Sequence, residues 1–386
     1  MRKNIALVMG LLLFLTACAE EDRRNVQPEK ATNTVRVGVF LSLTGTTAAY
    51  GTSALNAFKL ATEETNSGGG INGRRIELVV EDDHSNTDEV AGIVTKLVTR
   101  DKVHALLAEP ISTRAMIAAP IAQANKVVMI SPAAVKPELT EQGDFIFRAC
   151  FTSPSEAEVI ANFAVNKLGR KRAGIILDPK NDYAVVLARF FSDSFEKLGG
   201  EIVREENYEA SDKNVFAHIK RINGEKADVL FAPGFYTTAG MVARDVKLAD
   251  GPVLIGSDGW DSPNLLEGAG DAFDGAYFAN HFWIGSEDPL VLKFVEDYTR
   301  KFGTAPDAGA ATAYDAARML FDAIKRAQSV DSIAIRDALA KTADFPGVTG
   351  RITLNANRDA VVPVYMLRIE KGGKFSLQNE VRKNSE

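Results

Sequence analysis

The stretch "VHALLAEPISTRAMIAAPIAQANKVVMIS", residues 103–131, contains a complete strand–helix–strand unit. Its first and last segments, 103–109 and 126–131, are short apolar runs of the kind that form strands buried on both faces. The segment between them, 112–125, has apolar residues at helical spacing. A unit of this kind joins two parallel strands through a helix that covers the sheet. The stretch therefore predicts an α/β fold.

The same alternation continues on both sides of this unit. Strands and helices alternate from residue 34 to residue 152, and a second series starts at residue 153 and reaches residue 258. The chain closes with helical patterns and then two strand-like segments, 350–355 and 361–370, which we expect to pair as a hairpin. Two series favour two doubly wound lobes, each a parallel sheet with helices on both faces. About 350 residues are also too many for one compact core.

The N-terminal residues have the pattern of a secretory signal. Arg2 and Lys3 precede a short apolar run, and the small residues of "LTAC", 15–18, close it. This ending resembles that of bacterial lipoproteins, in which Cys18 is lipid-modified and becomes the mature N-terminus; an ordinary signal with an incidental cysteine is the alternative. Residues 18–33 are polar and lack apolar periodicity, as expected of a flexible tether. We expect a signal peptide over 1–17 and an exported protein that is lipid-anchored to a membrane, periplasmic or at the cell surface.

Composition excludes several classes of function. The net charge is −6 with mixed signs, so we expect no nucleic-acid partner. With Cys18 lipidated, Cys150 has no cysteine to pair with, and we expect it to be a buried small hydrophobe without a function. The four histidines lack the spacing of metal ligands, so no metal site is expected; they lie at positions 84, 104, 218 and 281.

Motifs of common enzymes are either missing or in the wrong setting. "GGGING", 68–73, fits G-x-G-x-x-G, but a helical pattern precedes it and a strand follows it. A dinucleotide-binding loop needs the reverse order, so we interpret these glycines as a helix stop and a turn. Three acids and a histidine stand together at 81–84. They could form a metal site or an acid–base pair, but we favour a solvated loop in which an Asp acts as a cap. No nucleophile has an evident base, and we expect neither an enzyme nor a cofactor.

The strand ends carry the distinctive residues. In open parallel sheets, ligands bind beyond the carboxyl ends of the strands. Here those ends are rich in small hydroxyl residues and aromatic rings, and one of them delivers an acid, Asp258. In "VVMISPAAVKPELT", 127–140, a buried strand runs into Ala133 and Ala134, whose small side chains would let the main chain approach a ligand near a helix start. The alternative is that small residues only make a tight turn.

Together these stretches resemble the bacterial solute-binding proteins of the leucine/isoleucine/valine type, which deliver ligands to ABC transporters. The resemblance runs in family order from Val35 to about Ile369, through "VGVFLSLTGTTAAYG", "NSGGGINGRRIELVVEDD", "ISPAAVKPELT", "DFIFRACFTSP", "NDYA", "GSDGW", "AFDGAYFA" and "TAYDAARML". It implies a type I periplasmic binding protein fold, with two lobes joined by three hinge crossings and a ligand cleft between them. The lobes implied are 34–152 with 282–346, and 153–281 with 347–386.

The resemblance also implies roles for individual residues. Ser112 matches the hydroxyl that meets a ligand's carboxylate, Ala133 the carbonyl that meets its amino group, and Asp258 the acid from the second lobe. The positions that wall the side-chain pocket match three aromatic residues: Tyr50, Tyr183 and Phe235.

Two positions depart from the family pattern. Val135 stands where many relatives have Thr, which removes a hydroxyl but keeps a backbone N–H, and Glu109 stands where Gly is commoner. The ligand implied by the resemblance is an amino acid, branched-chain or a related small carboxylate.

The predicted function is that of a monomeric extracytoplasmic receptor that captures this ligand and delivers it to an ABC transporter permease, with the membrane contacted through the N-terminal lipid. The alternative is a ligand-sensing lobe that reports a small molecule to a signalling partner.

Overall fold

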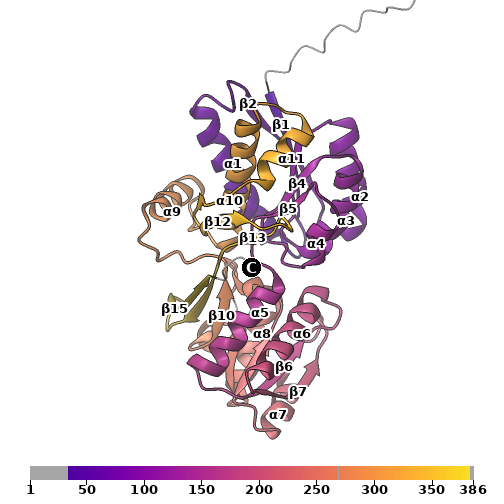
Figure 1. Ribbon diagram of the computed structural model, residues 1–386. Helices are drawn as coiled ribbons and strands as arrows, with labels where there is room; N and C mark the ends of the chain where they lie inside the picture. Colours follow the sequence, from indigo (N-terminus) through magenta and orange to yellow (C-terminus); the bar gives the residue numbers. More distant parts are fainter. Residues whose placement is uncertain (1–33, 268, 383–386) are drawn as a thin grey trace, which may run out of the picture. The chain divides into compact units, whose positions relative to one another are not determined.

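A computed structural model describes residues 34–267 and 269–382. The predicted signal peptide, the tether and Cys18 lie outside these residues. The first sheet is wholly parallel and has the order β2-β1-β3-β4-β5 (Figure 1). Its strands are β1 (Thr34–Leu41), β2 (Arg75–Asp82), β3 (Ala105–Leu107), β4 (Val128–Ser131) and β5 (Ile146–Arg148).

Both faces of this sheet are buried. In β3, Ala105 and Leu107 enter one hydrophobic cluster, whereas Leu106 enters another, because successive side chains of a strand point to opposite faces. The first cluster includes apolar residues of α1 (Ala48–Ser67), α10 (Ala308–Ala327) and α11 (Ser332–Ala340). The second includes those of α2 (Thr87–Thr95), α3 (Ser112–Ala124) and α4 (Glu138–Glu141). This arrangement explains why the strands read as continuous apolar runs.

The second sheet has the order β15-β14-β10-β9-β8-β6-β7. The pairs between β10 and β7 are parallel, whereas β14 and β15 are added antiparallel at one edge. The strands are β6 (Arg172–Leu177), β7 (Glu201–Asn207), β8 (Val229–Ala232), β9 (Val253–Gly256), β10 (Tyr277–Asn280), β14 (Pro363–Ile369) and β15 (Phe375–Arg382). Its helices are α5 (Ser153–Asn162), α6 (Asp182–Lys197), α7 (Phe216–Gly224) and α8 (Tyr236–Leu248). The predicted class, two α/β units built on doubly wound parallel sheets, is confirmed.

The hairpin expected near the C-terminus is wrong. β12 (Gly350–Leu354) pairs with β11 (Phe345–Gly347) and with the short β13 (Ala360–Val361), whereas β14 pairs with β10 and β15. The chain thus leaves the small sheet at Val362, a residue that belongs to no strand, and enters the seven-stranded sheet at Pro363.

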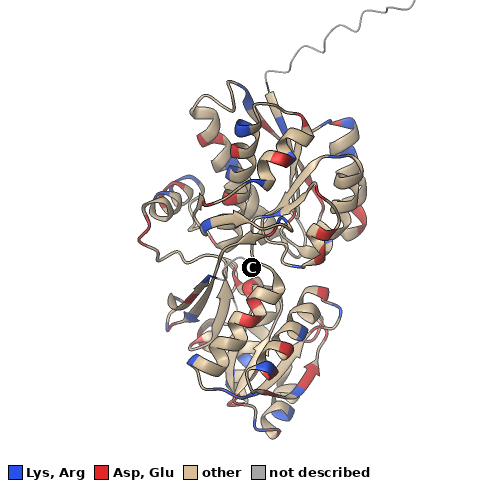
Figure 2. Ribbon diagram, in the orientation of Figure 1, with Lys and Arg blue, Asp and Glu red and all other residues tan. Residues whose placement is uncertain are grey.

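The remaining elements are short or lie outside the sheets. α9 (Pro289–Phe302) packs on α1, and brief π- or 3-10 turns occur at Lys96–Arg100, Phe163–Lys167, Asp258–Trp260 and Gly270–Phe273. No helix among the described residues is long and apolar enough to cross a bilayer. Acidic and basic residues are interspersed over the helices around both sheets (Figure 2).

Candidate functional site

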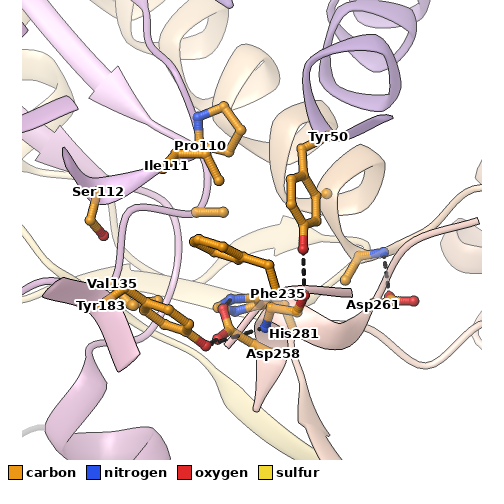
Figure 3. Close-up of a pocket in the computed structure, with 14 residues that line it drawn as sticks. Tyr50, Pro110, Ile111, Ser112, Val135, Tyr183, Phe235, Asp258, Asp261 and His281 are labelled. Atoms are coloured by element: carbon orange, nitrogen blue, oxygen red, sulfur yellow. Dashed lines mark hydrogen bonds and ion pairs between the residues drawn. The ribbon is translucent and has the colours of Figure 1, made fainter. Parts of the chain in front are cut away.

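One pocket collects residues that follow strands of both large sheets. Its residues surround about 520 Å³ of empty space, open solvent included. Figure 3 shows side chains that line it. Pro110, Ile111 and Ser112 face Asp258 and His281 across it. The full lining is Tyr50, Pro110, Ile111, Ser112, Ala133, Val135, Tyr183, Phe235, Asp258, Gly259, Asp261, His281, Ala308 and Gly309.

Every pocket residue predicted from the sequence lies in this lining. The structure brings together Tyr50, Ser112, Ala133, Val135, Tyr183, Phe235 and Asp258, from segments that begin at six different strand ends or helix starts. Their roles toward a ligand stay predictions. Glu109, the other departure from the family pattern, does not line the pocket, and Cys18 lies outside the described residues.

The side of the pocket built on the first sheet offers backbone donors. α3 begins at Ser112 and has no side-chain cap, so its first N–H groups lack the usual capping oxygen. The neighbouring loop is held by the Lys136 N–H, which donates to Ser112 Oγ over 3.4 Å, and by the Ser153 N–H, which donates to the Val135 carbonyl over 2.9 Å. Among the described residues, no hydrogen bond engages the Val135 N–H. An uncapped helix start beside a hydroxyl and a free amide suits an anion.

The side built on the second sheet presents a carboxylate. Asp258 follows β9, and its Oδ1 accepts a hydrogen bond from the Tyr183 hydroxyl. Its Oδ2 lies 2.8 Å from His281 Nε2. Burial raises the pKa of the Tyr183 hydroxyl, and the charge of Asp258 raises it further, so the phenol stays a donor. The pocket therefore has one end with backbone N–H donors and a hydroxyl and another end with a carboxylate.

Sequence reasoning missed two residues next to Asp258. Glu156 Oε1 accepts the Asp258 N–H over 2.8 Å, and His281 contacts the carboxylate itself. Burial raises the pKa of Glu156 well above its usual value, and the charge of Asp258 raises it further. A signal for His281 was present, because it directly follows the buried strand β10, as Asp258 closely follows β9. The sequence held no such signal for Glu156, because an acid in the first turn of a helix usually just interacts favourably with the helix dipole.

Aromatic rings form the wall between the two ends. Tyr183 and Phe235 stack with ring centroids 5.2 Å apart, and Tyr50 meets Phe235 edge-on at 5.9 Å. The Tyr50 hydroxyl donates to the Gly259 carbonyl, which joins α1 to the segment after β9. Burial raises the pKa of Tyr50. These rings favour a ligand with an apolar side chain.

A buried charge cluster lies behind the first-sheet side of the pocket. Glu109 Oε1 is 2.9 Å from Arg114 Nη2, and Arg114 Nε is 3.6 Å from Asp83 Oδ2. Arg114 also donates to Thr47 Oγ1, and Ser42 donates to both acids. Asp83 is thus buried, and the expectation of a solvated loop is wrong for this residue, although Asp82 does cap the loop by accepting the Leu43, Thr44 and His84 N–H groups. The cluster ties the ends of β1, β2 and β3 together.

Glu109 should make the stability of the protein depend on pH. Burial raises the pKa of Glu109 from 4.5 to about 7, against the opposing effect of Arg114. The folded state therefore holds a proton that the unfolded chain has released between these values, so stability falls as pH rises through this window. Relative to Glu109→Gln, the wild type should lose on the order of 3 kcal/mol between about pH 4.5 and pH 7. Urea unfolding of both proteins at several pH values in this range measures the difference. If the free energies of unfolding of the two proteins change with pH in parallel, the prediction is wrong.

Among residues 34–267 and 269–382, no group of three or more His, Cys, Asp and Glu side chains could hold a metal ion. Cys150 is free and buried, in agreement with its prediction as a small hydrophobe.

Comparisons with known proteins give matches over most of the chain. The family profile described as periplasmic binding protein matches residues 34–374. A Leu/Ile/Val-binding protein of Rhizobium johnstonii is 28% identical over 344 residues, which cover 88% of this chain and 93% of that protein. A leucine-binding protein of Thermotoga maritima superposes with a TM-score of 0.84 at 31% identity, covering 90% of this chain and 99% of the other. A branched-chain amino acid transporter substrate-binding protein of Streptococcus pneumoniae, solved with isoleucine, gives a TM-score of 0.85 at 31% identity, covering 91% and 100%.

Proposed function

Because the chain belongs to the family of periplasmic binding proteins, we propose that it is the receptor that captures an amino acid for an ABC transporter and delivers it to the permease. Membership in the family makes it an exported, periplasmic binding protein and not an enzyme. Its similarity to Leu/Ile/Val-binding proteins and to a leucine-binding protein supports a branched-chain amino acid or a related small carboxylate as the ligand.

The observation that carries the proposal is the pairing of two opposite ends in one pocket. A ligand carboxylate would bind the Ser112 hydroxyl, the uncapped start of α3 and the Val135 N–H. The α-amino group would bind Asp258 and the Ala133 carbonyl. The aromatic rings of Tyr50, Tyr183 and Phe235 would then pack on the side chain. A zwitterion with an apolar side chain complements all three parts at once.

A thermal-shift screen tests this function. Ligand at a hundred times its dissociation constant should stabilise the folded protein by about 2.7 kcal/mol. For a domain of about 350 residues, this corresponds to a rise of about 4 °C in melting temperature. We expect leucine, isoleucine or valine to give such a shift, and an acidic amino acid such as aspartate to give none. A screen in which only compounds without an amino group shift the melting temperature would contradict the proposal.

The lobe division is proposed in an adjusted form. The residues after β5 and after β10 are retained as the first two hinge crossings. The third boundary, predicted between 346 and 347, falls inside β11. Asp359, which lies beyond that boundary, accepts hydrogen bonds from Arg148 and Thr140 of the first lobe. Residues up to Asp359 therefore belong with the first lobe, which supports a crossing at Val362. In this division, Ser112 and Asp258 belong to different lobes.

We also propose a lipid anchor at Cys18, on the basis of "LTAC" at 15–18. Cys18→Ser should abolish incorporation of radioactive palmitate into the exported protein, because serine has no thiol to which the lipid could be attached. Cys150→Ser is the matched control and should keep the label. Equal labelling of wild type and Cys18→Ser would contradict an anchor at this position.

A further inference from the structure

His281 is a buried histidine that contacts the acidic end of the pocket. It is the first residue after β10, it is buried, and it lines the pocket. Its Nε2 lies 2.8 Å from Asp258 Oδ2, and its ring stacks on Phe151 with centroids 3.7 Å apart and planes 22° apart. Phe151 belongs to the segment between β5 and α5. The ring is therefore fixed from one side by Phe151 and touches the acidic end of the pocket with its edge.

Two donors hold the Asp258 carboxylate. The Tyr183 hydroxyl donates to Oδ1 and His281 Nε2 to Oδ2, one donor on each oxygen (Figure 3). An ionised carboxylate offers about four lone-pair positions, so about two remain for a ligand. Loss of either donor would free the carboxylate to turn about its side-chain bonds.

The other ring nitrogen of His281 makes no contact of this kind. Nδ1 is buried and has no hydrogen-bond partner among the described residues. Nε2 is therefore the ring atom through which His281 can orient Asp258, and with its proton there the ring leaves only an acceptor unpaired at Nδ1.

We propose that His281 is a specificity-determining positioning residue, which holds Asp258 for the ligand's amino group and so sets the preference for amino acids over carboxylates that lack one. This inference rests on the proposed function. It predicts that the loss of the Nε2 donor weakens binding of an amino acid but leaves binding of its amino-free analogue unchanged.

Two substitutions separate the hydrogen bond from the stack. His281→Phe removes the donor and keeps a ring against Phe151. His281→Gln loses the ring but retains an N–H donor at a similar distance from the main chain. His84→Phe makes the same change at an exposed histidine outside the pocket, where the side chain is 56% exposed. Melting temperatures of the ligand-free proteins show whether each variant is folded.

The test is calorimetric titration of wild type and variants with L-leucine and with isocaproate, which is leucine without its amino group. We expect His281→Phe to reduce the ratio of leucine affinity to isocaproate affinity about tenfold, as the weakening of one charge-assisted contact implies. His281→Gln should retain most of that ratio, and His84→Phe all of it.

The outcomes distinguish this inference from the proposed function. If His281→Phe weakens both ligands equally, or changes neither, His281 has only a structural role and the inference is wrong. The same holds if His281→Gln loses the ratio as fully as His281→Phe. A wild-type protein that binds leucine no more tightly than isocaproate contradicts the proposed function itself, and the inference falls with it.

Discussion

Asp258→Asn is expected to weaken the binding of L-leucine about a hundredfold, which corresponds to about 2.7 kcal/mol. The substitution removes the negative charge that would face the ligand's ammonium group, and a charge-assisted hydrogen bond is lost with it. The change also disturbs the empty site. Tyr183 and His281 both donate to Asp258, and an amide has only one oxygen to accept from them. Calorimetric titration of both proteins measures the effect.

A matched control is available around the same sheet. Asp271→Asn makes the same chemical change at a carboxylate that is 77% exposed and pairs with Lys247. We expect its leucine affinity to equal that of the wild type. If Asp258→Asn binds L-leucine as tightly as the wild type does, Asp258 does not bind the ligand's amino group.

Arg114→Met should have the largest effect on stability. Arg114 is buried and is the cation between Glu109 and Asp83, so its loss leaves two acids together in the interior. Removal of one partner from a buried ion cluster costs about 3–5 kcal/mol. At about pH 8, the melting temperature should fall by about 4–7 °C for a domain of this size. The fall should be smaller at about pH 5, because the raised pKa of Glu109 lets that acid take up a proton there.

The control for Arg114 is an arginine whose partners are exposed. Arg300 is 66% exposed and pairs with Glu296 and Asp297 on α9. Surface pairs of this kind contribute little, so Arg300→Met should change the free energy of unfolding by less than about 1 kcal/mol. If Arg114→Met unfolds at the same temperature as the wild type at both pH values, the cluster does not hold the strand ends together.

Much of the fold follows from local patterns that the sequence displays. The central strands of both sheets are buried on both faces, so they appear as short apolar runs, and helices such as α6 and α10 carry an apolar stripe. The hairpin prediction failed because it relied on proximity in the chain. Of residues 361–370 only Val361 pairs with β12, whereas β14 pairs with β15 and with β10, more than eighty residues earlier. Pairing over such a separation depends on tertiary packing and leaves no local mark.

The pocket was predictable to the extent that it follows from topology. Parallel strands gather their carboxyl ends at one edge of a sheet, so Ser112 and Ala133, which follow strands of the first sheet, could be placed near each other. Asp258 follows a strand of the other sheet, and its place opposite them was implied by the family resemblance. The environment of Asp258 could not be predicted from the sequence. Whether a carboxylate is free or held by neighbours depends on side chains such as His281 and Glu156, whose contacts form only when the helices and strands pack. Glu109 shows the same limit, since a residue that departs from a family pattern proves to be one partner of a buried ion pair.

The most direct test of the proposed function is a crystal structure of the protein grown with L-leucine. We expect the leucine nitrogen within about 3 Å of the Asp258 carboxylate and its carboxylate at a similar distance from Ser112 Oγ and the Val135 N–H. The side chain should lie against Tyr50, Tyr183 and Phe235. Leucine bound in the reverse orientation, leucine bound outside this pocket, or an empty pocket at saturating leucine would contradict the proposal that this site recognises an amino acid.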